Sequence, residues 1–172
     1  MEVRPGQRGF SVVEVLVAAA IFLIIAVGIL PLFTQAMYAN MAGRDATEVS
    51  NAGRSQAEEM LNVPYEALQV PAGKFEGVTE DYWSKSADGW QAGPAPTAGY
   101  GYASDVLWVR ITRVRQYSRQ DLVDDGFANA PLVGGTPADQ VFFKEIEVEV
   151  RSNRPTLVGG GKSLRLKVLR AV

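Results

Sequence analysis

The sequence predicts an α+β fold in which one long N-terminal helix packs on a C-terminal antiparallel sheet. Two observations lead to this prediction. Apolar residues fill the segment after residue 10 and then recur every three or four positions, which is typical of a helix. Nearer the C-terminus, three segments alternate apolar and polar residues, which is typical of strands that bury one face.

The first element is an apolar run from Phe10 to Phe33 that holds a single charged residue, Glu14. About 24 helical residues span about 36 Å, which exceeds the ~30 Å hydrocarbon core of a bilayer. Arg4 and Arg8 precede the run and no charge follows it until Arg44, so the positive-inside bias places the N-terminus in the cytoplasm. We therefore expect residues 10–33 to cross a membrane once.

Two ordinary interpretations of this run are a secretory signal peptide and an uncleaved signal anchor. A secretory signal peptide needs an apolar region of about 7–15 residues and a small-x-small cleavage site, whereas this run is longer and unbroken. An uncleaved signal anchor stays open, but it does not explain why Glu14 lies close to the Gly9-Phe10 junction. A carboxylate inside a bilayer costs roughly 2.5–3.5 kcal/mol, so Glu14 calls for a partner or a function.

The helix should continue through residues 34–63 as an amphipathic segment and stop before Pro64. Gly53 either lets the sheet approach closely or is a tolerated helix glycine that costs about 1 kcal/mol. Pro31 and Gly28 interrupt the apolar half, where we expect a kink or a local opening. The predicted buried stripe is Ala46, Val49, Gly53, Ala57 and Met60, with Arg44, Glu48, Gln56 and Glu59 mostly on other faces.

Residues 64–172 should form a globular head. Its first part, residues 71–104, is rich in glycine and proline and shows no sustained period, so we interpret it as a long structured loop. Aromatic residues are interleaved there. They either pin the loop onto the core or bind a glycan or a partner protein. These aromatic residues are Tyr82, Trp83, Trp90 and Tyr100.

The three alternating segments should form the sheet that covers the helix stripe. If the last two strands pair antiparallel, outward-facing glutamates of one lie across from basic residues of the other, where each pair adds about 0.2–1 kcal/mol. The apolar positions are Leu107, Val109 and Ile111, then Ile146, Val148 and Val150, then Leu164, Leu166 and Val168. The charged positions are Glu145, Glu147 and Glu149 on one strand, and Arg165 and Lys167 on the other.

Composition argues against most enzyme chemistry. The chain has no cysteine and no histidine, which excludes disulfides, thiolate metal sites and every Ser-His or Cys-His nucleophile. A net charge of −2 gives no reason to expect a nucleic-acid partner. We expect no enzyme and no cofactor, although a membrane-tethered enzyme built on carboxylates stays open.

Two short motifs are weak. Gly159-Gly160-Gly161-Lys162-Ser163 ends like a phosphate-binding loop, but Thr156 stands where that loop needs glycine, and a strand follows instead of a helix. Asp124-Asp125-Gly126 offers oxygen ligands to calcium, yet no ligand series at calcium-loop spacing surrounds it. We interpret both as turns and expect no metal site.

The N-terminal segment, residues 9–33, resembles the class III signal of the type IV pilin superfamily, which type IV pilins and type II secretion pseudopilins share. The resemblance rests on the basic leader, the Gly9-Phe10 junction, the nearby Glu14 and the long apolar helix. Residues 51–61 with Pro64-Tyr65 resemble the helix end of PilV-type minor pilins and I-type pseudopilins. The chain lacks the C-terminal cysteine pair of many major pilins, which favours a minor subunit or a pseudopilin.

The resemblance implies that prepilin peptidase removes leader residues 1–9 by cleaving between Gly9 and Phe10, and then methylates the new amine. It implies that Glu14 pairs with the amine of another subunit during assembly and that Pro31 lies where the helix bends or melts. The implied partners are other major and minor pilins, prepilin peptidase, the inner-membrane assembly platform and, before assembly, membrane lipid. The implied location is the bacterial inner membrane with a periplasmic head, and afterwards the pilus on the cell surface.

Three functions follow as expectations. The first is a minor pilin of a type IV pilus in a priming or tip complex, with adhesion, motility and DNA uptake left open. The second is a type II secretion pseudopilin. The third, from another class, is a membrane-anchored periplasmic binding module that uses the aromatic region as its site and needs neither cleavage after Gly9 nor Glu14.

Overall fold

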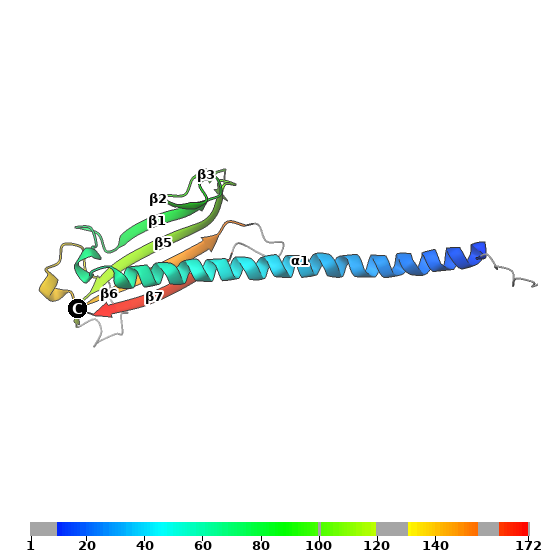
Figure 1. The fold of residues 1–172 in the computed structure, drawn as a ribbon. Coiled ribbons are helices and arrows are strands. Elements are labelled where there is room, and N and C mark those ends of the chain that lie inside the picture. The colour runs from blue at the N-terminus through cyan, green and yellow to red at the C-terminus, as the bar shows by residue number, and fades with distance from the viewer. Residues whose placement is uncertain (1–9, 100, 120–130, 155–161, 172) are drawn as a thin grey trace, which may run out of the picture. The chain divides into compact units, whose positions relative to one another are not determined.

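The computed structural model describes residues 10–99, 101–119, 131–154 and 162–171, and the chain divides into two compact units, Met1–Ala42 and Gly43–Val172. One long helix comes first and the strands follow it (Figure 1). The elements are α1 (Val12–Asn62), the 3-10 turn η1 (Tyr65–Ala67), β1 (Gly77–Ser84), β2 (Gly89–Ala92), β3 (Thr97–Ala98), β4 (Gly101–Tyr102), β5 (Val106–Tyr117), the 3-10 turn η2 (Ala138–Gln140), β6 (Phe143–Ser152) and β7 (Ser163–Ala171).

In the N-terminal unit, helix α1 is continuous through Gly28 and Pro31. The local opening that the sequence led us to expect at Pro31 is therefore not observed. Thr34, one turn later, donates its hydroxyl to the carbonyl of Pro31 at 2.8 Å and to that of Leu30 at 3.3 Å.

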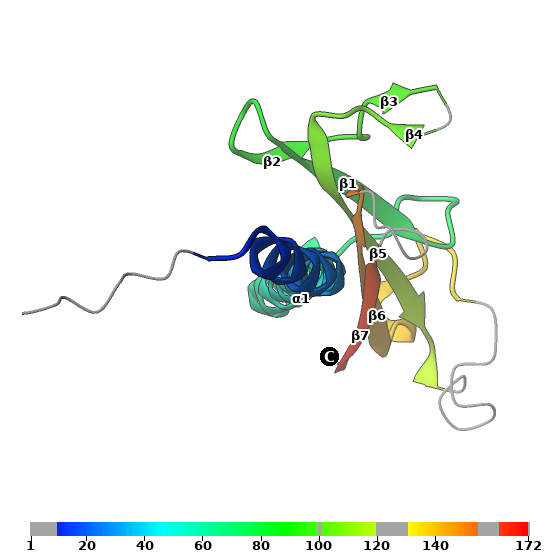
Figure 2. The same ribbon diagram turned by 90° about the vertical axis from the view of Figure 1, so that its right-hand side faces the viewer.

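The main sheet of the C-terminal unit has five antiparallel strands in the order β2-β1-β5-β6-β7 (Figure 2). Strands β3 and β4 form a separate pair. The predicted pairing of the last two strands is confirmed, since Glu147 lies opposite Lys167 and Glu149 opposite Arg165. The predicted α+β layout, a helix on an antiparallel sheet, is therefore confirmed.

The prediction of a long loop over residues 71–104 was wrong, because β1 and β2 lie inside it. The alternation was hidden because both faces of β1 carry aromatic rings. Tyr82 packs on one face against the cluster around Val106 and Val109, and the neighbouring Trp83 meets Trp90 and Trp108 on the other. A strand half-buried on both sides gives no period-2 contrast between apolar and polar positions.

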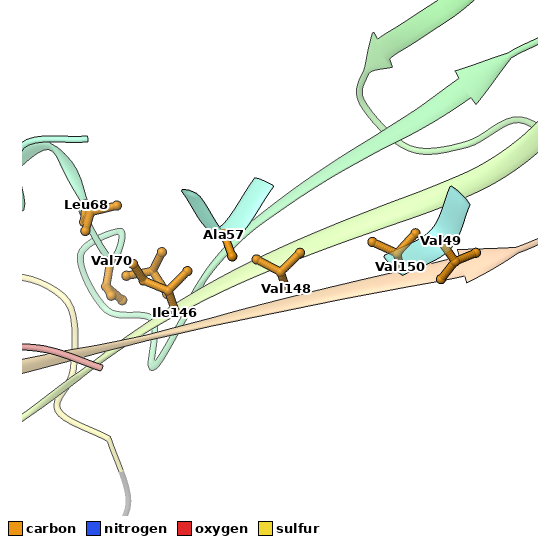
Figure 3. Close-up of a cluster of buried hydrophobic side chains, with 8 residues drawn as sticks. Val49, Ala57, Leu68, Val70, Ile146, Val148 and Val150 are labelled. Atoms are coloured by element: carbon orange, nitrogen blue, oxygen red, sulfur yellow. The ribbon is translucent and has the colours of Figure 1, made fainter. Parts of the chain in front are cut away.

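The main core lies between the C-terminal half of α1 and β5, β6 and β7 (Figure 3). Ile146, Val148 and Val150 are at most 1% exposed, as the predicted strand face requires. The predicted face of the first strand was wrong, because Val109 and Ile111 belong to a second cluster with Ala95 and Val106, and Val114 of β5 belongs to the core beside the helix instead. Gly53 is the point of closest approach, because a Cβ there would lie 2.9 Å from a methyl carbon of Leu164. Of the two interpretations of Gly53, the structure supports the close approach of helix and sheet.

The predicted helix stripe was partly wrong. Val49, Gly53 and Ala57 are buried as expected, but Ala46 is exposed, whereas Asp45 and Gln56 are buried. The contact stripe starts one residue earlier than predicted because Asp45, although charged, has polar partners on the sheet that make its burial tolerable.

The opposite face of the sheet carries a set of ion pairs that we call the charged ladder: Arg113 and Arg115 on β5, Glu145, Glu147 and Glu149 on β6, and Arg165 and Lys167 on β7. The sequence predicted that the glutamates lie on this outward face across from Arg165 and Lys167, which is confirmed for Glu147 and Glu149. The side chains of the three glutamates are only 5–9% exposed. The arginines of β5 lie over them and supply the partners that burial requires.

Candidate processing and assembly segment

Helix α1 begins with a side-chain cap. The backbone N–H of Val13 donates to the hydroxyl of Ser11 at 3.3 Å, and the N–H groups of Glu14 and Val15 donate to the Ser11 carbonyl at 3.0 and 3.1 Å. A serine in this place satisfies N–H groups that a helix start otherwise leaves unpaired. The helix therefore starts two residues after Phe10, close to the predicted cleavage junction.

Glu14 lies in the first turn of α1, and its side chain is exposed. A carboxylate there faces the positive end of the helix dipole, which is worth about 0.3–1 kcal/mol at an exposed site. That local gain is smaller than the cost of placing a carboxylate in hydrocarbon, roughly 2.5–3.5 kcal/mol. The interaction with the helix dipole therefore does not offset the cost of placing Glu14 in the membrane. The hypothesis that Glu14 pairs with a cation of another molecule still explains that cost.

The side chains that follow Glu14 form an apolar surface that no other described residue of the unit covers. Large side chains from Phe10 to Met41 are exposed, among them Phe22, Leu30 and Phe33. The described helix is apolar and long enough to cross a membrane, and none of that stretch is buried. Such a surface is stable only where something else covers it.

The backbone around Pro31 has one carbonyl group left over. Proline has no N–H, so the carbonyl of Val27 lacks its usual helical donor four residues later. Apart from the two bonds that Thr34 makes to the carbonyls of Leu30 and Pro31, the described contacts give this part of α1 no extra support. Pro31 therefore removes one backbone hydrogen bond from the interior of α1.

Of the four residues predicted for processing and assembly, the structure describes Phe10, Glu14 and Pro31, while Gly9 lies outside the described residues. Phe10 is 82% exposed. All three described residues belong to the N-terminal unit, in the order that the sequence indicates.

A model of the prokaryotic N-terminal methylation motif matches residues 4–30 of the chain. The chain has a prepilin-type N-terminus. This motif indicates a type IV pilin-like or pseudopilin-like prepilin, a structural subunit that prepilin peptidase processes and that assembles with other pilins. Together with the apolar helix, it indicates membrane anchoring. Comparison with curated proteins and with solved structures gave no match.

No group of three or more His, Cys, Asp or Glu side chains that would hold a metal occurs in the part of the chain that the structure describes. The proposed turn at Asp124-Asp125-Gly126 and the glycine run Gly159-Gly160-Gly161 lie outside that part. Their interpretation as turns stays a prediction.

Sequence reasoning missed a buried polar cluster where the C-terminal half of α1 meets the sheet. Asp45, 3% exposed, accepts hydrogen bonds from the hydroxyl of Ser152 at 3.0 Å and the indole N–H of Trp108 at 3.4 Å. Arg154 stacks on the Trp108 ring at 4.9 Å and pairs with Glu48 at 3.1 Å. A charge on an otherwise apolar helix stripe was the signal that would have pointed to this cluster.

At the C-terminal end of α1, side chains from distant strands donate hydrogen bonds to backbone carbonyls. The last turn of α1 contains no basic residue, but Arg170 of β7 donates to the carbonyls of Met60 and Val63. Lys144 of β6 donates to the carbonyl of Tyr65 at 2.8 Å and lies over its ring. Burial lowers the pKa of Lys144. These two side chains satisfy carbonyls at the helix end, and no local pattern predicts them.

Of the aromatic residues proposed as a binding site, Trp83 and Trp90 contact each other, Tyr82 packs against the cluster around Val106 and Val109, and Tyr100 lies outside the described residues. The ring centroid of Trp83 lies 5.7 Å from the ring centroids of both Trp90 and Trp108, in edge-to-face geometry. Arg110 lies 4.4 Å over the ring of Trp90 and pairs with Asp81 at 2.9 Å. The flat ring faces that a sugar would stack on are thus partly occupied by the protein's own side chains, which favours the pinning interpretation.

Proposed function

We propose that the chain is a minor pilin: prepilin peptidase cleaves it between Gly9 and Phe10, and it enters a type IV pilus through residues 10–33. The observation that carries this proposal is the methylation motif over residues 4–30. The motif continues into a helix whose apolar surface is exposed among the described residues of its unit. A bundle of similar helices from other subunits would cover that surface.

The chemistry of assembly follows from the new N-terminus. Cleavage leaves an amine on Phe10, and an amine of this type stays cationic at neutral pH. Glu14 lies in the first helical turn, exposed, and is free to meet such an amine on a neighbouring subunit. Pairing the two charges inside an apolar bundle offsets the cost of burying either one alone.

Two features support a minor subunit. The chain has no cysteine, so it lacks the disulfide that tightens the head of many major pilins. The head is instead held by ion pairs and by the close contact at Gly53. A type II secretion pseudopilin shares both features, so deletion phenotypes are needed to separate the two: loss of surface pili supports the minor pilin, and loss of protein secretion with pili intact supports the pseudopilin.

Replacing Gly9 with leucine tests the proposal directly, with intact-mass measurement of the membrane-extracted protein. We expect the full-length chain to accumulate with its leader attached, because the peptidase must accommodate the residue before the cut. The matched control is Gly6→Leu, which changes the leader but leaves the junction. If wild-type protein keeps its leader, or if Gly9→Leu yields a mature chain that starts at Phe10, the proposal fails and the anchored binding module gains support.

A further inference from the structure

Strand β7 is the outermost strand of the main sheet (Figure 1). It pairs with β6 on one side over nine positions, and no described strand pairs with its other side. The sheet's opposite edge is β2, which is only four residues long. An unpaired edge of this length presents backbone groups that another extended chain can join.

The register identifies which backbone groups face outward. The N–H of Ser152 donates to the carbonyl of Lys162 at 2.8 Å, so this is a hydrogen-bonded pair. In an antiparallel ladder every second residue shares that geometry, and therefore Leu164, Leu166, Val168 and Arg170 bond to β6. The residues between them, Ser163, Arg165, Lys167, Leu169 and Ala171, direct their N–H and C=O groups to the free edge.

The same outward-directed residues carry the basic side chains of the charged ladder. Across the sheet, the sign of charge on this face changes from strand to strand. Glu76, just before β1, pairs with Arg115 of β5 at 2.9 Å, and Arg115 pairs with Glu145 of β6 at 2.9 Å. Lys167 of β7 follows at 3.4 Å from Glu145. The alternation ends on a basic strand at an open edge.

The cations of β7 are held less tightly than those of β5. Arg113 hydrogen-bonds Glu147 and Glu149 at 3.1 and 2.9 Å and is 19% exposed. Arg165 approaches the same two carboxylates only to 3.4 and 3.6 Å, and its side chain is 57% exposed. Arg165 makes no side-chain hydrogen bond to another described residue. Its guanidinium donors remain available to a further carboxylate.

We propose that the free edge of β7 binds an extended segment of a partner protein that carries acidic side chains at alternate positions. The segment adds antiparallel to β7 as the next strand of the sheet. Its acidic residues lie directly opposite Arg165 and Lys167, on the face of the charged ladder, and continue the alternation of sign. Backbone hydrogen bonds supply most of the affinity and the carboxylates supply the selectivity.

A second copy of β7 fits this edge poorly. Antiparallel pairing of two β7 strands around their centres places Lys167 opposite Lys167 or opposite Arg165, and like charges directly opposite one another are destabilising. The basic residues thus reject self-association while they select an acidic strand. The inference rests on the sheet alone, so it stands or falls separately from the proposed pilin function.

The test uses a labelled, capped heptapeptide in which valine and glutamate alternate, titrated with the full-length protein in nonionic detergent at low salt. In the proposed geometry, the glutamate amides face β7 and the valine amides face away. N-methylation of the glutamate amides should weaken binding about tenfold or more, whereas N-methylation of the valine amides should leave it within about threefold. Replacing glutamate with glutamine should weaken binding about threefold or more.

Protein variants give a second, independent readout. Lys167→Pro removes an outward N–H without touching a bond to β6 and should abolish binding, while Arg165→Gln should weaken it. The matched control is Arg54→Gln, which removes the same charge from an exposed position on α1. Three results would overturn the proposal: no binding up to about 1 mM peptide, equal binding of both N-methylated peptides, or an equal loss with Arg54→Gln and Arg165→Gln.

Discussion

The two units of this chain satisfy their side chains in opposite ways. From residue 43 onward, apolar side chains meet across the helix and sheet, and most buried charges have ion-pair partners. In residues 10–42, the large apolar side chains are exposed, and Glu14 forms no ion pair with another described residue. The C-terminal unit buries its own apolar side chains. The apolar side chains of the N-terminal unit are buried only where lipid or other protein subunits surround them.

The difference teaches where function lies. A region that satisfies itself contributes stability, so changes there should alter unfolding. A region with an unpartnered apolar surface and a lone carboxylate contributes contacts to other molecules, so changes there should alter assembly and leave folding intact.

Removing the carboxylate of Glu14 should have the largest effect, and it should appear only in assembly. We expect Glu14→Ala to be processed and to reside in the membrane. The fraction of the protein found in sheared filaments should fall about tenfold or more, because the amine of the neighbouring subunit loses its partner in an apolar core. The measurement is the ratio of filament-associated to membrane-associated protein, with cleavage checked by mass. Glu14→Asp, which keeps a carboxylate, is the control. Wild-type recruitment of Glu14→Ala would refute charge pairing.

The same substitution in the two units should have unequal effects on unfolding. Ile146→Ala should lower the free energy of unfolding by about 2–5 kcal/mol, because Ile146 is only 1% exposed. Ile24→Ala should leave it unchanged, since Ile24 is 71% exposed. All three tryptophans belong to the head, so their fluorescence during urea denaturation in detergent reports on that unit alone. Similar losses for both variants would contradict the division.

Acid should destabilise the head through Glu149. A hydrogen bond from Arg151, together with one from Arg113, holds the pKa of Glu149 at about 2, although burial opposes this. Because the folded pKa lies below the ordinary value of 4.5, the stabilisation is present above pH 4.5 and is lost as the pH falls toward 2. The loss should be on the order of 3 kcal/mol. Urea denaturation at several pH values measures it, and Glu149→Gln should flatten the dependence. An unchanged slope would be the contrary result.

The smallest effect should come from filling the contact between helix and sheet. Gly53→Val should cost about 1–3 kcal/mol, because a Cβ at Gly53 already crowds Leu164 and Leu166. Gly43→Val on the same helix is the matched control, since nothing lies within 4 Å of a Cβ there. Thermal unfolding followed by tryptophan fluorescence compares the two. Equal stability would mean that Leu164 moves aside without cost.

Sequence reasoning predicted the elements whose physical cause is local and periodic. The helix end follows from Pro64 and the buried face of β6 from the spacing of its apolar residues, and both were confirmed. It failed where a distant partner decides. Asp45 is buried because Ser152 and Trp108 donate hydrogen bonds to its carboxylate, and neither residue lies near it in the sequence.

In the candidate site, too, sequence alone identified residues with a local signal and missed contacts between distant strands. Glu14 and Pro31 were found because an isolated charge and a proline are conspicuous in an apolar run. Strand β1 was missed because its two faces differ too little in polarity for a periodic signal. The burial of Glu147 was missed because it depends on how Arg113 and Arg115 lie over it, which the pattern of one strand does not contain.

The contact of Arg170 with the end of α1 bears on how the head comes to be folded. This side chain joins carbonyls that lie 110 and 107 residues earlier, so the helix terminus is closed only when the last strand has arrived. Contacts of such sequence separation form late, because a long loop must close first. In a chain that emerges N-terminus first, the apolar stripe of α1 is only partly covered, by β5 and β6, until β7 is present. The head should therefore fold as one cooperative event only once β7 is present, with an interval before it in which the partly exposed apolar surface favours aggregation.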